Sequence, residues 1–301
     1  MKSTRTISTR FMLVPLWACL LALPAQAQCP RFSGALEQGG FIWATVAPGS
    51  KVTLDGEHLD VLADGTTFAG FGRDAAATAQ LVVTGEQPCT ETLQVAAREY
   101  RIQRVEGVPQ KTVTPPKEEL ERILREQALV NAARAESFQR PDLLVGVIGG
   151  FVWPAQGPIS GVYGSQRYYN GKAGRPHYGV DVAAPTGTPV MAPAAGIVTL
   201  AEPDLFYSGG TVILDHGYQV SSTFLHMSEV SVKVGDELRP GDLIGAIGAT
   251  GRATGPHLDW RMNWRQQRID PQLLTPAMPA PEPEPESKPE PGLAQKPVPK
   301  S

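Results

Sequence analysis

The 301-residue chain is poor in cysteine and histidine and has no surplus of positive charge. It contains three cysteines and five histidines. Basic residues number 27 against 30 acidic ones, so the charge balance gives no reason to expect nucleic-acid binding. The apolar run at residues 11–23 is too short for a spanning helix, which needs about 20 residues. A hydrophobic content of 42% and a charged content of 19% are typical of a globular protein.

The N-terminus has the pattern of a secretory signal peptide. Three basic residues precede the apolar run: Lys2, Arg5 and Arg10. Ala25-Gln-Ala27 supplies the small residues of a cleavage site. Cleavage after residue 27 would leave a formal charge of −6. We therefore expect residues 1–27 to direct export to the periplasm or cell envelope, with an uncleaved anchor as the alternative.

The cysteines agree with an exported protein. Cys19 lies in the signal segment, which leaves Cys29 and Cys89. One pair in an oxidising compartment predicts a disulfide, worth about 4 kcal/mol in the chain-entropy model. Lipid attachment at Cys29 is the alternative, but Gln28 replaces the small residue that such processing requires.

Residues 28–110 have the pattern of a small β-sandwich. Short alternating or β-branched runs are separated by Pro-Gly and Asp-Gly turn signals. The runs are Phe41–Val46, Lys51–Leu54, Gln80–Val83 and Glu91–Val95. No catalytic set of residues occurs among them, so we expect an accessory domain.

Residues 111–144 predict a helical linker. Thr114 and Pro115 suit the start of a helix, which we expect to run to about residue 137. Its apolar stripe consists of Leu120, Ile123, Leu124 and Val130. The stripe favours a connecting helix packed on one domain over a coiled-coil dimer.

Residues 145–275 predict a compact β-rich domain, because glycines and prolines interrupt short β-type apolar runs. Residues 276–301 are rich in Pro, Glu and Lys and predict a disordered tail. The expected fold class is therefore mainly β.

Three of the five histidines fall in the segments that hold two His–Asp pairs or lie between them. His177 precedes Asp181 by four residues, and His257 precedes Asp259 by two. In a strand, residues i and i+2 share a face, so His257 and Asp259 would point the same way. With His226 between the two pairs, this concentration indicates a metal site.

The motifs around these residues resemble the M23 (lysostaphin/LytM-type) zinc metallopeptidases, which cut peptide cross-links in bacterial peptidoglycan. The resemblance covers residues 148–270. Its motifs occur in the family's order: Ile159-Ser-Gly-Val-Tyr-Gly164, His177-Tyr-Gly-Val-Asp181, Gly210-Thr-Val-Ile-Leu-Asp-His-Gly217, Thr223-Phe-Leu-His226 and Gly248-Ala-Thr-Gly-Arg-Ala-Thr-Gly-Pro-His257.

The resemblance implies a role for each site residue. His177 and Asp181 would bind one Zn²⁺ ion, while His226 and His257 would orient water and stabilise the oxyanion. Arg167 and Arg252, in loops beside the motifs, are candidates for binding substrate carboxylates; solvated loop cations are the alternative.

Asp259 departs from the family pattern, which has a second histidine as the third zinc ligand. Three interpretations follow. Asp259 is itself the third ligand, at the cost of a less acidic zinc-bound water; the metal site is degenerate; or Asp259 pairs with Arg261 in a structural network. His216 fits a structural role better than that of a substitute ligand.

We expect an exported zinc metalloendopeptidase that hydrolyses peptide cross-links or stem peptides of peptidoglycan. The alternative is an inactive LytM-like domain that binds peptidoglycan or activates a cell-wall amidase or another envelope regulator. With two carboxylates in the site, the sequence leaves open whether zinc or another divalent ion binds.

Overall fold

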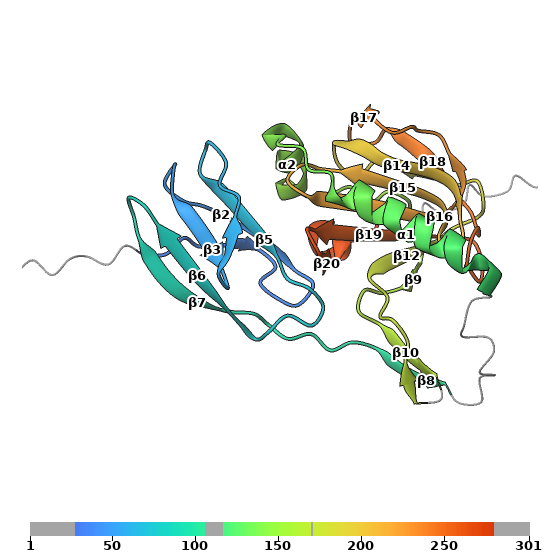
Figure 1. The fold of residues 1–301 in the computed structure, drawn as a ribbon, viewed down its shortest axis with the longest axis horizontal. Coiled ribbons are helices and arrows are strands. Elements are labelled where there is room, and N and C mark those ends of the chain that lie inside the picture. Colours follow the sequence, from blue (N-terminus) through green and yellow to red (C-terminus); the bar gives the residue numbers. More distant parts are fainter. Residues whose placement is uncertain (1–27, 106–116, 170, 280–301) are drawn as a thin grey trace, which may run out of the picture.

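The computed structural model describes residues 28–105, 117–169 and 171–279. The predicted signal peptide, the first residues of the predicted linker (111–116) and most of the predicted tail (280–301) lie outside the described residues. The protein is mainly β, with an N-terminal sandwich, a connecting helix and a C-terminal β-rich domain (Figure 1). Within the described ranges, no helix combines the length and apolarity needed to cross a membrane.

Two antiparallel sheets form the N-terminal domain. The first has the order β1-β2-β5, with β1 at Ser33–Gly34, β2 at Phe41–Thr45 and β5 at Thr66–Gly70. The second has the order β4-β3-β6-β7, with β3 at Lys51–Leu54, β4 at Glu57–Leu59, β6 at Thr78–Thr84 and β7 at Cys89–Gln94. Alternate residues of β6 are buried, which is the expected pattern for one face against a core.

The predicted disulfide is present. Cys29 and Cys89 are bonded, with their Cα atoms 5.5 Å apart. The bond ties the start of the described chain to the first residue of β7 and closes a loop across the sandwich.

The linker contains a short 3-10 turn, η2 (Lys117–Glu119), and helix α1 (Leu120–Ala135). The predicted apolar stripe is wrong in part, because Leu120 and Leu124 are 47% and 57% exposed. Val130 and Ala133 instead pack against Leu200, Leu205 and Ile213 of the C-terminal sheet. At 100° per residue, both leucines fall away from the helix face centred on Val130.

A second helix, α2 (Pro141–Ile148), was not predicted and crosses the expected domain boundary at residue 145. Pro141 suits its first turn, and Leu144 and Val147 are fully buried. With eight residues, the helix is too short for the 3.6-residue period to stand out in the sequence.

One large sheet dominates the C-terminal domain. Its main path is β17-β14-β15-β16-β19-β12-β9, with β13, β18 and β20 attached to it. The strands are β9 (Ile159–Gly161), β12 (Gly179–Ala183), β13 (Pro189–Met191), β14 (Gly196–Leu205), β15 (Gly209–Asp215), β16 (Val220–Val230), β17 (Glu237–Leu238), β18 (Leu243–Ile247), β19 (His257–Trp264) and β20 (Gln267–Ile269). A 3-10 turn, η3 (Pro271–Leu274), follows β20.

A small separate sheet connects the two domains (Figure 1). Strand β8 (Ile102–Val105), which leaves the sandwich, pairs in parallel with β10 (Gln166–Tyr169). Strand β11 (Lys172–Ala173) completes it. The segment after the sandwich is therefore built into a loop region of the C-terminal domain.

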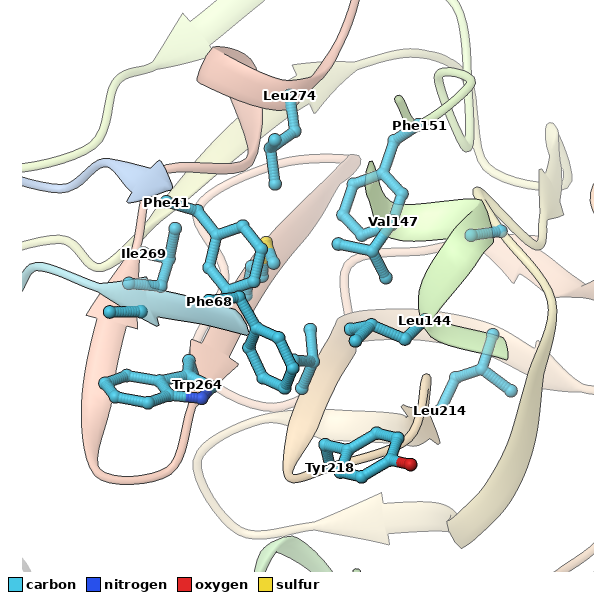
Figure 2. Packing of buried hydrophobic residues seen from close by; sticks show 14 of the residues in the cluster. Phe41, Phe68, Leu144, Val147, Phe151, Leu214, Tyr218, Trp264, Ile269 and Leu274 are labelled. Carbon is cyan, nitrogen blue, oxygen red and sulfur yellow. The ribbon is translucent and has the colours of Figure 1, made fainter. Parts of the chain in front are cut away.

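The two domains also share one hydrophobic core. Figure 2 shows Phe41 and Phe68 of the sandwich beside Trp264 and Ile269 of the C-terminal domain. The contact is close, because a Cβ added at Gly70 would lie 2.5 Å from the Ile269 side chain. Burial of these large apolar side chains holds the domains together.

Candidate metal site

The site lies where β12 and β19 pair. Asp181 and Asp259 are directly opposite each other in the antiparallel register. His257 and Asp259 share a face of β19, as their spacing predicts, while Leu258 and Trp260 point to the other face and are fully buried. The two segments that are distant in sequence thus place their polar side chains on one face.

The three predicted ligands come together. The candidate ligand atoms of His177, Asp181 and Asp259 all lie within 4.8 Å of one another. The Nε2 atom of His177 is 3.1 Å from Oδ1 of Asp181. Both side chains are about one-fifth exposed, so the group is recessed but open to solvent.

These atoms fit a metal ion. His177 Nε2 and Asp181 Oδ1 are buried and have no hydrogen-bond partner within the described part of the chain. Two ligands at about 2.0–2.2 Å from a tetrahedral ion lie roughly 3.3–3.6 Å apart, close to their observed separation. A cation bound between these two atoms would offset the cost of burying them without hydrogen-bond partners.

Two glycines leave room for the carboxylates. A Cβ at Gly161 of β9 would lie 2.0 Å from Asp181 Oδ2, and one at Gly179 would lie 2.5 Å from Asp259 Oδ1. Any other residue at either position would displace a site carboxylate.

The loop that carries His177 is fixed by its backbone. The His177 N–H donates to the Ser165 carbonyl, and the His177 carbonyl accepts from the Gly164 N–H, both at 2.8 Å. The first domain supports this loop, because Nε of Arg73 donates to the Gly164 carbonyl at 2.8 Å. Residues of both domains therefore position His177.

Asp259 has a second partner. Nε of Arg261 donates to its Oδ1 and Oδ2 at 3.0 and 3.1 Å, and Arg261 Nη2 also contacts Oδ2. Burial raises the pKa of Asp259, but the charge and hydrogen bonds of Arg261 outweigh it, and the pKa falls below its ordinary value. Asp259 is therefore an ionised carboxylate shared between Arg261 and the candidate metal position.

The acidic surroundings also act on His177. Burial lowers its pKa, but the nearby carboxylates of Asp181 and Asp259 outweigh it, leaving the pKa above the ordinary value. The carboxylates thus attract a positive charge to this position, whether a proton or a metal ion.

His226 stands beside the ligand group in an unusual backbone conformation, with φ at +65°. Its Nδ1 lies 2.9 Å from the Thr250 carbonyl. Because a carbonyl only accepts, Nδ1 carries the proton and neutral His226 presents a bare Nε2. Burial lowers the pKa of His226, which keeps it neutral near pH 7.

His257 is arranged in the same way. Its Nδ1 lies 2.8 Å from the Gly255 carbonyl and therefore carries a proton, so that Nε2 is the nitrogen that faces the candidate ligands. That Nε2 is 3.9 Å from Asp181 Oδ1, and the His257 and His226 ring centroids are 4.9 Å apart. Two imidazole rings, each with Nδ1 held by a backbone carbonyl, therefore stand next to the candidate ligands.

The remaining histidine of this domain, His216, is fully buried away from the site. Its Nδ1 lies 2.7 Å from the Ala195 carbonyl and its Nε2 lies 2.9 Å from Ser222 Oγ. Burial lowers its pKa to about 4. With both ring nitrogens hydrogen-bonded in the core, His216 has a structural role.

The contacts of Arg167 and Arg252 are with residues other than the candidate ligands. Arg167 is exposed on β10 and donates to Gln103 Oε1 at 3.0 Å. Arg252 stacks over the Tyr207 ring at 4.8 Å. Their assignment to substrate binding stays a prediction.

Sequence reasoning missed several residues around the site. Thr250 and Gly255 fix the histidine tautomers through their carbonyls, which any residue type supplies. Arg134 and Arg268 approach Arg261 from α1 and β20. Only the packing of a distant helix and the β19–β20 turn brings them there, so no local motif could have indicated them.

Residues 175–271 match the family model of peptidase family M23. This part of the chain is an M23 peptidase domain. The family assignment made from the sequence motifs is therefore confirmed.

Two curated proteins are similar to part of this chain. The DD-carboxypeptidase/endopeptidase Mpg of Neisseria meningitidis is 39% identical over 114 residues, 38% of this chain and 26% of that protein. The peptidoglycan DD-endopeptidase ShyA of Vibrio cholerae is 38% identical over 95 residues, 32% of this chain and 22% of that protein. The chain thus spans about a quarter of the length of these curated relatives.

A solved structure from Pseudomonas aeruginosa, described as an M23 peptidase, resembles a larger part of the molecule. It covers 79% of this chain and 93% of its own, with a TM-score of 0.59 and 28% identity. Residues 117–279 alone could not supply that coverage, so the likeness extends into the first domain.

Proposed function

We propose that this protein is an exported zinc metalloendopeptidase that hydrolyses peptide cross-links or stem peptides of peptidoglycan. The observation that carries the proposal is the pair of buried ligand atoms without a hydrogen-bond partner, His177 Nε2 and Asp181 Oδ1, beside Asp259 and two histidines. The names of the relatives, a DD-carboxypeptidase/endopeptidase and a peptidoglycan DD-endopeptidase, support the substrate class and a place in the cell envelope.

His177, Asp181 and one oxygen of Asp259 would hold the ion. Bound zinc supplies a Lewis acid for the scissile carbonyl and lowers the pKa of its water to about 7. The two carboxylates reduce the net charge of the ion, while Arg261 withdraws part of the negative charge of Asp259. Arg261 would therefore partly restore the acidity of the zinc-bound water, which a third ligand of Asp259 in place of histidine would lower.

The two histidines move the proton. The bare Nε2 of His257 is the nearer to Asp181 and takes a proton from the attacking water. Protonated His257 then returns that proton to the leaving amine. His226 donates to the developing oxyanion only when its own Nε2 is protonated, which its lowered pKa disfavours near neutrality. Its oxyanion role therefore requires protonation within the reaction cycle or lower pH.

The test combines metal content with product analysis. Residues 28–301, loaded with one equivalent of zinc, are incubated with purified peptidoglycan sacculi, and released muropeptides are resolved by mass. We expect the wild type to consume cross-linked dimers, and His177→Ala to lose both zinc and hydrolysis. His58→Ala, which alters an exposed histidine of the first domain, is the matched control and should behave like the wild type.

A second candidate function is an inactive domain that binds peptidoglycan or activates a cell-wall amidase. The Asp259–Arg261 ion pair favours it, because a guanidinium already neutralises the third candidate ligand. Zinc titration of Arg261→Met separates the two candidates. If Asp259 is a ligand, removing the competing cation should tighten zinc binding roughly tenfold, within the range of outer-shell effects. If neither the wild type nor Arg261→Met binds zinc or cuts sacculi, the peptidase is wrong and the binding domain stands.

A further inference from the structure

We propose that Arg134, Arg261 and Arg268 form a binding site for a carboxylate of the peptide substrate, beside the candidate metal site. The inference rests on the proposed function and deepens it, because it names the feature of the substrate that this site recognises. Three structural observations carry it.

The first observation is the convergence of three cations on the site face of the sheet. Thr223 of β16 is directly opposite Arg261 of β19, and Arg134 of α1 reaches over to Thr223 Oγ1 at 3.4 Å. Asn263 follows Arg261 on the same face and accepts a hydrogen bond from Arg268 Nη1 at 2.9 Å. The face of β19 thus runs from His257 and Asp259 directly into a group of guanidinium groups.

The second observation is a shortage of negative charge. Arg261 pairs with Asp259, but neither Arg134 nor Arg268 forms a salt bridge within the part of the chain that the structure describes. Nε of Arg134 is buried without any hydrogen-bond partner there. Burial, followed by the charges of Arg268 and Arg261, lowers the pKa of Arg134 to about 9. Like charges held together in this way favour an anionic ligand.

The third observation is space for that ligand. A pocket of about 500 Å³ lies between the domains and is lined by Arg268, by Tyr178 and, from the first domain, by Arg73 and its ion-pair partner Asp74. Tyr178 is the neighbour of His177 in the chain. The pocket therefore connects one cation of the cluster with the segment that carries a candidate metal ligand.

A carboxylate is the anion that fits. The guanidinium fork binds planar carboxylates through two parallel hydrogen bonds, and peptides supply carboxylates at their C-terminus and on acidic side chains. Bound there, a substrate carboxylate would lie next to His177 and Asp181 and would fix which amide reaches them. A C-terminal carboxylate and an acidic side chain would make the same contacts with the arginines. The experiment therefore tests each of them separately.

The test uses zinc-free protein, so that binding is measured without hydrolysis. The probe is a synthetic peptide that contains one acidic residue and ends in D-alanyl-D-alanine. It is prepared with both carboxylates free, with a C-terminal amide, or with a side-chain amide. We expect one of the two amides to weaken binding of the peptide to wild-type protein at least tenfold, which identifies the carboxylate that is bound.

The variants assign this preference to the cluster. Arg134→Gln and Arg268→Gln should each bring the amide-to-acid ratio of dissociation constants close to one, and Arg134→Lys should restore part of it. Arg125→Gln alters an exposed arginine of the same helix and should keep the wild-type ratio. Equal binding of all three peptides by the wild type, or an unchanged ratio in both glutamine variants that melt like the wild type, overturns the proposal.

A parallel assay with zinc-loaded protein separates this proposal from the proposed function. Hydrolysis of sacculi together with equal binding of all three peptides means that the carboxylate site is wrong and the peptidase stands. Discrimination in binding without hydrolysis of any substrate means that the site stands and the peptidase is wrong.

Discussion

Alternate residues of β19 belong to two different regions of the molecule. Leu258, Trp260 and Met262 are fully buried in the core, whereas His257 and Asp259 face the candidate metal site. The apolar residues fix which face of the strand is buried, because a slip by one residue would expose them. That register places Asp259 opposite Asp181. Core packing on one face therefore positions the chemistry on the other.

A change on the site face of β19 should have the largest effect and should separate the roles of the two faces most clearly. His257→Ala should slow hydrolysis of sacculi by roughly 10²–10⁴-fold, the usual contribution of a general acid–base group. It should leave zinc binding and the unfolding free energy near the wild-type values, because His257 is not a proposed ligand and is partly exposed. Kinetics, metal content and denaturant unfolding of the same preparation check this. Loss of zinc or of folding would contradict the separation of the two faces.

The matching change on the core face is Trp260→Ala. Trp260 is fully buried and packs against the rings of Phe151 and Trp153, so its removal should lower the unfolding free energy by roughly 3–5 kcal/mol. Denaturant unfolding measures the loss. A variant as stable as the wild type would show that the core face does not hold the strand in register.

Removal of the first domain tests the core face of the sheet at the domain boundary. A chain that starts at residue 117 would expose Trp264 and Ile269, which Phe41 and Phe68 cover. It would also lose the Arg73 contact behind His177. We expect a loss of roughly 3 kcal/mol in unfolding free energy and slower hydrolysis. Faster hydrolysis by the shortened chain would instead show that the first domain restrains the site.

The smallest expected effect is a pH dependence from Asp215 and His216. Burial raises the pKa of Asp215 to about 7 and lowers that of His216 to about 4. As pH falls below about 6.5, His216 gains its proton first in the unfolded chain, which destabilises the fold. Asp215 gains its proton first in the folded chain as pH falls below 7, which stabilises the fold and offsets that loss.

Asp215→Asn removes the offset while keeping an acceptor for the Gly217 N–H. Between pH 7 and pH 5 the variant should lose roughly 2 kcal/mol more unfolding free energy than the wild type. Denaturant unfolding at the two pH values tests this, and equal losses in both proteins would contradict the assigned pKa directions.

Local patterns made the fold class, the disulfide and the M23 domain predictable. The spacing of His257 and Asp259 predicted their common face, which depends only on strand geometry. The Asp259–Arg261 pair was one of three open interpretations, because two residues on one strand face can meet or diverge. Helix α2 and the approach of Arg134 depend on packing between distant segments, which no local pattern encodes.

The account depends most on one metal held by His177, Asp181 and Asp259. Anomalous diffraction at the zinc edge from crystals of zinc-loaded protein tests this most directly. The account predicts one strong peak, with His177 Nε2, Asp181 Oδ1 and an Asp259 oxygen each about 2.0–2.2 Å away. No peak at this position in zinc-soaked crystals, with Arg261 still bound to both Asp259 oxygens, would contradict it.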